Sequence, residues 1–149
     1  MRNRLLVLSL FLAAGATLRA EDNKFDKTIP FPRGGEVSLD WSYQKCVIKS
    51  VKVVDYPADF EVDKARREDP NDKSNIGWEF FIDNRSSAKY EVHLSVEVLD
   101  KSGQVIKAGD RTPSVSAHEA ENVKVSTRMR TVEAADAPKV RLRAEIVPK

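Results

Sequence analysis

The amino-acid sequence predicts an all-β protein, built as a two-sheet antiparallel β-sandwich. Apolar and polar residues alternate with a period of two along most of the chain after residue 25, as they do in strands with one buried and one exposed face. Turn-forming residues separate the alternating segments. The chain has 149 residues, of which 41% are hydrophobic and 32% charged, so it suits a single domain with one core.

Three strands are predicted in the first half of the chain. The segment 25–31 contains Pro30 and is followed by Pro32, and neither proline has a backbone N–H. This strand is therefore expected at a sheet edge. Residues 37–43 and 47–53 continue the alternation as the second and third strands.

The second half of the chain shows the same alternation. Its strands are predicted at residues 78–82, 90–98, 105–108, 123–129 and 140–146. Asp100-Lys101-Ser102-Gly103 forms the hairpin turn between the second and third of these, with Gly103 free to take a positive φ.

Seven to eight strands with one apolar face favour two antiparallel sheets around one core, and among such sandwiches the immunoglobulin-like arrangement. A closed barrel is the alternative, because strand spacing alone does not decide closure. A single cysteine cannot form a disulfide within the chain, so Trp41 or Trp78 is expected to fill the centre of the core.

Two segments do not follow the strand pattern. Residues 63–75 contain eight charged side chains among thirteen, and we expect one helical turn stopped by Pro70 and then a loop. Residues 132–137 are expected to form a short helix that ends at Pro138.

Residues 1–20 have the pattern of a signal peptide. Two arginines precede an apolar run at residues 5–14, which is about half the length that a helix needs to cross a bilayer. Cleavage is expected after Ala20. The mature chain, residues 21–149, would then form a single periplasmic or secreted domain without a membrane anchor.

Signal cleavage would also change the charge of the protein. It removes Arg2, Arg4 and Arg19 from the 25 basic residues and none of the 23 acidic ones, so the net charge changes from +2 to about −1. A nucleic-acid partner is therefore not expected.

The middle third of the chain resembles the FxLYD-type immunoglobulin-like domains of secreted bacterial proteins. The similarity lies in a strand that ends in Asn84-Arg85-Ser86 and in the stretch Val96-Glu97-Val98-Leu99-Asp100 before a glycine turn. Both aromatic positions of the motif are aliphatic here. The resemblance implies a β-sandwich outside the cytoplasm without enzymatic activity, and it supplies no binding residues.

Basic residues on the polar faces of two late strands are the candidate interaction surface. They are Lys124 and Arg128 on one strand, and Lys139, Arg141 and Arg143 on the next. If these strands are neighbours, they form a positive stripe that could bind a protein or an anionic envelope polymer. Glu91 and Glu97 on another strand could instead pair with them, as exposed charges often do.

The residues typical of metal sites and catalysis are scarce. The only histidines are His93 and His118, and a zinc site needs three or four converging ligands, so neither a metal nor another cofactor is expected. Cys46 has no histidine partner nearby in the sequence. It is either buried or available for an intermolecular disulfide. No nucleophile elbow and no phosphate-binding glycine loop occurs.

These observations favour a non-enzymatic exported module for protein–protein or envelope-polymer interaction. The binding surface would be the basic stripe or an unpaired sheet edge. A self-assembling structural subunit of the envelope or of an appendage is the alternative. A hydrolase that uses paired carboxylates is a third, weaker hypothesis.

Overall fold

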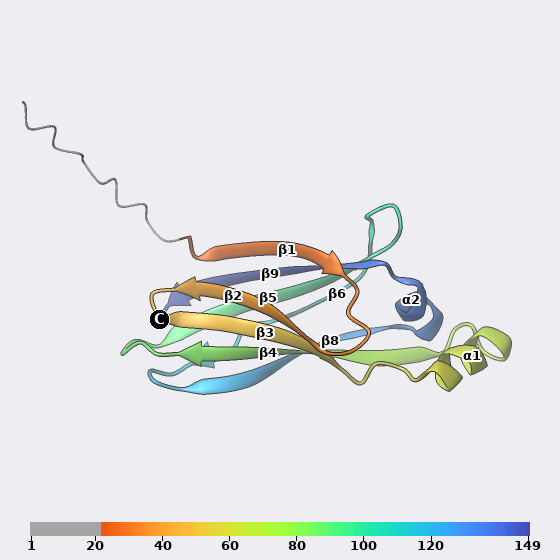
Figure 1. Ribbon diagram of the computed structural model, residues 1–149, viewed down its shortest axis with the longest axis horizontal. Helices are drawn as coiled ribbons and strands as arrows, with labels where there is room; N and C mark the ends of the chain where they lie inside the picture. The colour runs from red at the N-terminus through yellow and green to blue at the C-terminus, as the bar shows by residue number, and fades with distance from the viewer. Residues whose placement is uncertain (1–21) are drawn as a thin grey trace, which may run out of the picture.

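The computed structural model describes residues 22–149 and shows a sandwich of two antiparallel sheets (Figure 1). The sandwich prediction is confirmed. The predicted signal segment, residues 1–20, lies outside the described residues.

Sheet A has five strands. The spatial order is β1 (Lys24–Pro30), β9 (Lys139–Pro148), β5 (Tyr90–Leu99) and β6 (Val105–Arg111), and the short β7 (Ser114–Val115) also pairs with β5. Sheet B has four strands in the order β2 (Glu36–Tyr43), β3 (Cys46–Val54), β4 (Lys73–Asn84) and β8 (Ala120–Arg130). As predicted from Pro30 and the nearby Pro32, β1 lies at an edge and pairs only with β9.

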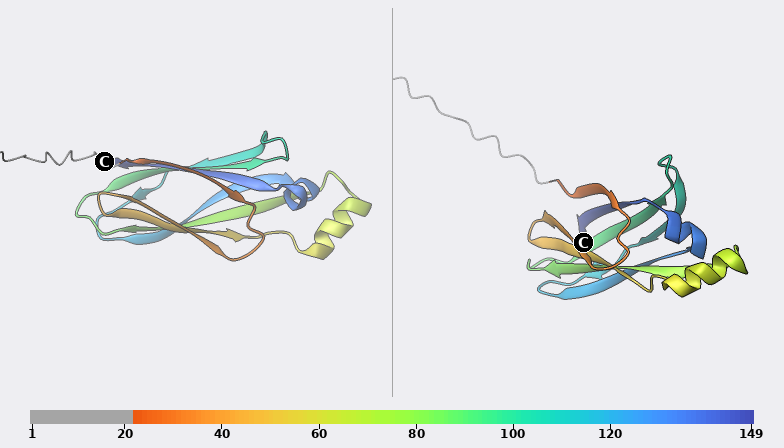
Figure 2. Two further views of the ribbon diagram at one scale, coloured as in Figure 1. Left: turned by 45° about the horizontal axis from the view of Figure 1, so that its top comes forward. Right: turned by 45° about the vertical axis from the view of Figure 1, so that its right-hand side comes forward.

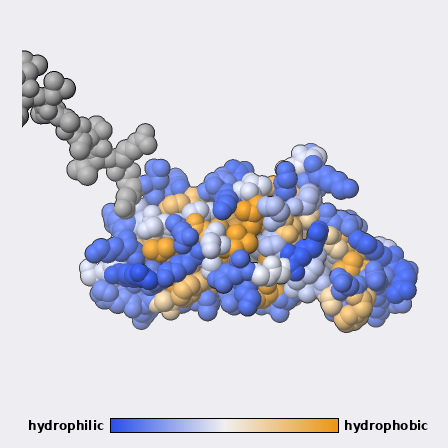
Figure 3. All heavy atoms as spheres, viewed as in Figure 1, coloured by the Kyte–Doolittle hydropathy of each residue, from blue (hydrophilic) through white to orange (hydrophobic). Residues whose placement is uncertain are grey.

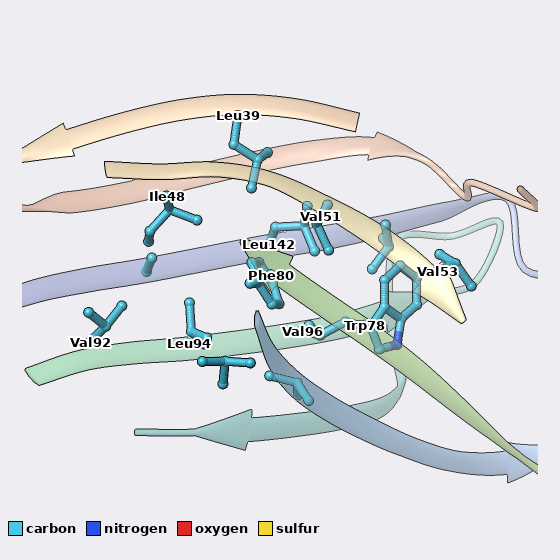
Figure 4. Close-up of a cluster of buried hydrophobic side chains, with 14 of the residues drawn as sticks. Leu39, Ile48, Val51, Val53, Trp78, Phe80, Val92, Leu94, Val96 and Leu142 are labelled. Carbon is cyan, nitrogen blue, oxygen red and sulfur yellow. The ribbon is translucent and has the colours of Figure 1, made fainter. Parts of the chain in front are cut away.

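The apolar faces of both sheets meet in one core (Figure 4). Of the two tryptophans, Trp78 fills its centre. Its side chain is fully buried, and its ring lies edge-on to Phe31 with the ring centroids 5.2 Å apart. The indole Nε1 donates a hydrogen bond to the buried Thr127 hydroxyl at 3.0 Å. Trp41 is only partly buried and stacks on Phe25.

The two sheets have unpaired edges on both sides of the sandwich. On one side β1 and β2 are linked by the stacked rings of Phe25 and Trp41, 5.6 Å apart. On the other side β6 approaches β8, but no ladder joins these two strands. The chain therefore does not form the closed barrel that the sequence left open. The face seen in Figure 3 is largely hydrophilic, with hydrophobic residues gathered near its middle.

Helix α1 (Asp59–Arg67) connects β3 to β4 at one end of the sandwich, where α2 (Thr131–Asp136) also lies (Figure 2). The helix begins earlier than the sequence predicted, because the Glu61 carboxylate accepts the Ala58 backbone N–H at 2.8 Å and Val62 and Ala65 are buried. The expected loop is also shorter, since Lys73 already pairs with Arg130 of β8.

The connection from β4 to β5 is held by one buried side chain. Asn84 has no exposed surface. Its amide Nδ2 donates to the carbonyl oxygens of Ala88 at 2.8 Å, Val115 at 3.2 Å and Ser116 at 2.9 Å. Its Oδ1 accepts the backbone N–H of Ser86 at 3.0 Å. The Asn-x-Ser sequence at this position therefore has a structural role in clamping a loop onto β7.

Candidate functional site

The five predicted basic residues are divided between the two sheets. Lys124 and Arg128 lie on β8 in sheet B, whereas Lys139, Arg141 and Arg143 lie on β9 in sheet A. The condition for a continuous stripe is not met, because β9 lies between β1 and β5, and β8 pairs only with β4. The reason is α2, which carries the chain from one sheet to the other. Alternation along a strand identifies its exposed face, but it does not tell which sheet contains the strand.

Acidic neighbours balance the charge of the two arginines at the centre of sheet A. The Arg141 guanidinium donates to the Asp26 carboxylate, with Nε 2.9 Å from Oδ1. Arg143 lies 3.5 Å from Asp26 and 3.3 Å from Glu97. The hydrogen bond from Arg141 holds the pKa of Asp26 below its ordinary value, and both arginine charges add to this effect. These residues therefore form a mixed-charge network on β1, β9 and β5 rather than a positive surface.

The other three basic residues are farther apart. Lys124 pairs with Asp55 at 2.5 Å, on the outer side of sheet B. Within residues 22–149, Arg128 and Lys139 have no ion-pair partner. These two residues lie on different sheets.

A groove of about 470 Å³ lies on the outer face of sheet A and crosses β1, β9, β5 and β6. The register places Asp26 opposite Arg143, Arg143 opposite Ser95, and Ser95 opposite Asp110. Ser95 has the shortest side chain in this row, with a larger side chain on each side. The short Ser95 side chain therefore lies between two larger side chains within the groove.

A second row of side chains runs beside the first. It contains Lys24, Glu145, His93 and Thr112. Lys24 lies 3.7 Å from Glu145, and the His93 Nδ1 is 3.2 Å from the Thr112 hydroxyl. Two aromatic rings occur among the lining residues: the Phe25 ring, which stacks on Trp41, and the exposed His93 imidazole. The groove therefore offers mainly hydrogen-bonding and charged groups, together with one exposed imidazole.

Two groups in the groove keep free hydrogen-bonding capacity. In the described part of the chain, neither the Ser95 hydroxyl nor the Asp110 carboxylate has a side-chain partner. Ser95 lies opposite Arg143, which has five N–H donors in a planar fork, and Asp110 lies opposite Ser95 on the other side. A donor–acceptor hydroxyl, an acceptor carboxylate and a guanidinium thus converge on one hollow, which suits a ligand that both donates and accepts hydrogen bonds.

No protein-family model matches the chain, and no curated protein matches it. The resemblance to FxLYD-type domains therefore stays a prediction.

Three solved structures show a weak likeness to the chain. A β-glucuronidase from glycoside hydrolase family 2 has a TM-score of 0.37 and 15% identity over 44% of this chain and 7% of that chain. The enzymatically active domain of the bacteriophage CBA120 tailspike protein 4 has a TM-score of 0.25 and 9% identity over 85% and 17%. TmCBM61 in complex with β-1,4-galactotriose has a TM-score of 0.19 and 10% identity over 85% and 80%. The chain spans less than a fifth of the length of the first two, and a likeness at these scores says nothing about function.

Sequence reasoning identified Arg143 and missed Asp26, Ser95 and Asp110 as parts of this site. These three side chains do fall on the polar positions of their strands, which is a signal in the sequence. The sequence does not contain the register across β1, β9, β5 and β6 that aligns them.

Cys46 is fully buried at the start of β3. Of the two alternatives for this thiol, the structure shows the buried one. Burial, together with the nearby Asp83 charge, raises the pKa of the Cys46 thiol to about 11.

The raised pKa of Cys46 predicts a loss of stability in alkaline solution. The folded protein holds the thiol proton more tightly than the unfolded chain, whose thiol has an ordinary pKa of 9.0. The stability that comes from this tighter proton binding is fully present below pH 9.0 and is lost as the pH rises through about 11. Relative to Cys46→Ala, the wild type should lose up to about 3 kcal/mol of unfolding free energy. Urea titrations of both proteins across this pH range measure the difference, and parallel pH profiles would contradict the prediction.

Residues 22–149 contain no group of three or more His, Cys, Asp or Glu side chains placed to hold a metal ion. No helix among these residues is long and apolar enough to cross a membrane.

Proposed function

We propose that this protein is a non-enzymatic binding module of the exported compartment, and that it binds a hydroxyl-rich envelope polymer in the groove on sheet A. The observation that carries the proposal is the pair of unpartnered groups, Ser95 and Asp110, which line one hollow together with Arg143. The groove crosses four strands on one face, so an extended chain can contact several of them at once.

The balance of charge favours a neutral polymer over the anionic one expected from the sequence. An anionic polymer needs unpaired cations, but Arg141 and Arg143 are held by Asp26 and Glu97. A sugar hydroxyl can donate to the Asp110 carboxylate while a neighbouring hydroxyl accepts from Arg143. A polysaccharide with vicinal hydroxyl groups is the ligand that best fits these donors and acceptors.

The state of the carboxylates supports a binding role rather than hydrolysis. A glycoside hydrolase needs one carboxylic acid with a raised pKa to protonate the leaving group. The pKa of Asp26 is instead lowered by Arg141, and Glu145 pairs with Lys24. These two carboxylates therefore suit ligand contacts and ion pairing better than proton donation.

The burial of the Cys46 thiol does not support the disulfide-linked form of the self-assembly alternative. With the thiol of Cys46 buried, cross-linking through this residue would require the chain to unfold. What is left is association through the unpaired strand edges of the two sheets.

Filling the groove tests the proposal. Ser95→Trp adds a large side chain within the groove without changing the charge, and it should weaken binding by about tenfold or more. Thr28→Trp is the matched control, because Thr28 is exposed on the same outer face but does not line the groove. Affinity electrophoresis of the three proteins in gels that contain neutral or uronic-acid polysaccharides gives the comparison. Equal retardation of Ser95→Trp and wild type would contradict the proposal.

A further inference from the structure

A second cavity lies on the side of the sandwich where β6 faces β8. The two strands are closest near Gly109, where an added Cβ would lie 2.5 Å from the Ser126 carbonyl oxygen. At the same end, Arg111 donates to the Lys124 carbonyl oxygen at 3.1 Å. Only a residue without a side chain fits at Gly109, so the two sheets touch at this point.

Towards the other end of β6 the two strands separate and leave a cleft of about 630 Å³. Residues from the β5–β6 hairpin, from the end of β8 and from α2 line this cleft, and the hairpin projects beyond the rest of sheet A (Figure 2). The apolar lining residues are Val105, Ile106, Val132 and Ala137. Val105 is 51% exposed, and in the described chain Phe60 is the only other large hydrophobic residue that is exposed.

We propose that the cleft between β6 and β8 accepts an extended acidic peptide, which adds as a strand to the open edge of β6. An edge strand presents unpaired backbone N–H and C=O groups, and these bind an extended segment without regard to its sequence. Every second side chain of such a segment would point into the cleft, where Val105, Ile106 and Val132 can cover an apolar residue. This is a binding site separate from the groove on the outer face of sheet A.

The charges around the cleft indicate an acidic partner. Two of the three acidic groups that line it form ion pairs, Glu133 with Arg130 and Asp136 with Arg66. The Asp100 carboxylate accepts the backbone N–H groups of Ser102 and Gln104 within the hairpin turn. By contrast, Lys101 on the rim and Lys107 on β6 have no ion-pair partner within residues 22–149.

The same two lysines have a competing explanation. Lysine on an exposed edge strand is a common protection against unwanted strand pairing. That explanation predicts that β6 binds no extended peptide of either charge, whereas the proposed site predicts saturable binding of an acidic one.

Titration with synthetic peptides distinguishes the two. The probes are two acetylated and amidated heptapeptides, Asp-Glu-Val-Thr-Val-Glu-Asp and the version with lysine at every acidic position. They are added to the ¹⁵N-labelled mature protein, and amide chemical shifts are followed by NMR. The acidic peptide should produce saturable shifts at residues 105–107 and at Val132, and the basic peptide should produce none.

Two matched variants locate the site. Val105→Asn should weaken binding of the acidic peptide by about fivefold or more, because it removes exposed apolar surface at the cleft. Phe60→Asn makes a comparable change at the other exposed hydrophobic residue, on α1, and should leave the affinity unchanged. The proposal is overturned by the absence of saturable shifts, by equal binding of both peptides, by shifts confined to the β1 or β2 edges, or by an unaffected Val105→Asn variant.

Discussion

Replacing Trp78 by alanine should destabilise the domain by about 3–5 kcal/mol. The side chain has no exposed surface and lies between both sheets, in edge contact with Phe31. Its removal leaves a cavity that the surrounding β-branched side chains can fill only in part. It also deprives the buried Thr127 hydroxyl of the hydrogen bond that it accepts from the indole N–H. A loss of this size is a large part of the total stability of a typical domain.

Trp41→Ala is the matched control for Trp78→Ala. Trp41 is partly buried and stacks on Phe25 at the margin of the sandwich, so its loss should cost markedly less. Chemical unfolding followed by far-ultraviolet circular dichroism compares the two variants without relying on tryptophan fluorescence. A cost for Trp78→Ala no greater than that for Trp41→Ala would show that the core centre lies elsewhere.

Asn84→Asp should destabilise the domain by about 3 kcal/mol or more, although the two side chains have the same shape. The asparagine Nδ2 faces the carbonyl oxygens of Ala88, Val115 and Ser116. An aspartate places an oxygen there, so a buried acceptor meets three acceptors and the loop loses its clamp on β7. The repulsion between these oxygens and the loss of the hydrogen bonds both destabilise the folded domain.

Asn71→Asp gives the control for Asn84→Asp. Asn71 is exposed in the loop between α1 and β4, so the same chemical change should alter the unfolding free energy by less than about 0.5 kcal/mol. Urea unfolding at neutral pH measures both variants. Similar values for the two would mean that the Asn84 amide does not hold the loop.

The sequence was sufficient for the elements whose side chains alternate without interruption. The residues of β5 alternate from Tyr90 to Val98, and the observed strand spans Tyr90–Leu99. The Asp100–Gly103 turn was also predictable, because Gly103 takes a positive φ of 84° there. In these places one local pattern determines the structure.

Elements that depend on distant partners were predicted less well. Helix α1 begins at Asp59 because Val62 packs into the interior of the molecule. The charged residues 63–75 contain no signal from which this contact, and so the start of the helix, could be predicted. The extension of β4 to Lys73 depends on its pairing with β8. Both outcomes are tertiary, so local propensity could not give them.

The candidate site shows the same limit. Alternation correctly placed Arg141 and Arg143 on an exposed face, but their pairing with Asp26 joins residues more than a hundred positions apart. Whether a basic strand is a binding surface depends on the strands beside it. Their order in the sheet, and not the basic residues alone, turned the expected positive stripe into a mixed-charge groove.

The most direct test of the polymer-binding groove is an NMR titration of the mature protein with a short, soluble fragment of the polysaccharide that the gels identify. The proposal predicts chemical-shift changes centred on Ser95, Asp110 and Arg143, their absence in Ser95→Trp and their persistence in Thr28→Trp. Shifts centred on sheet B, or the same shifts in Ser95→Trp, would contradict the assignment of the groove as the binding site.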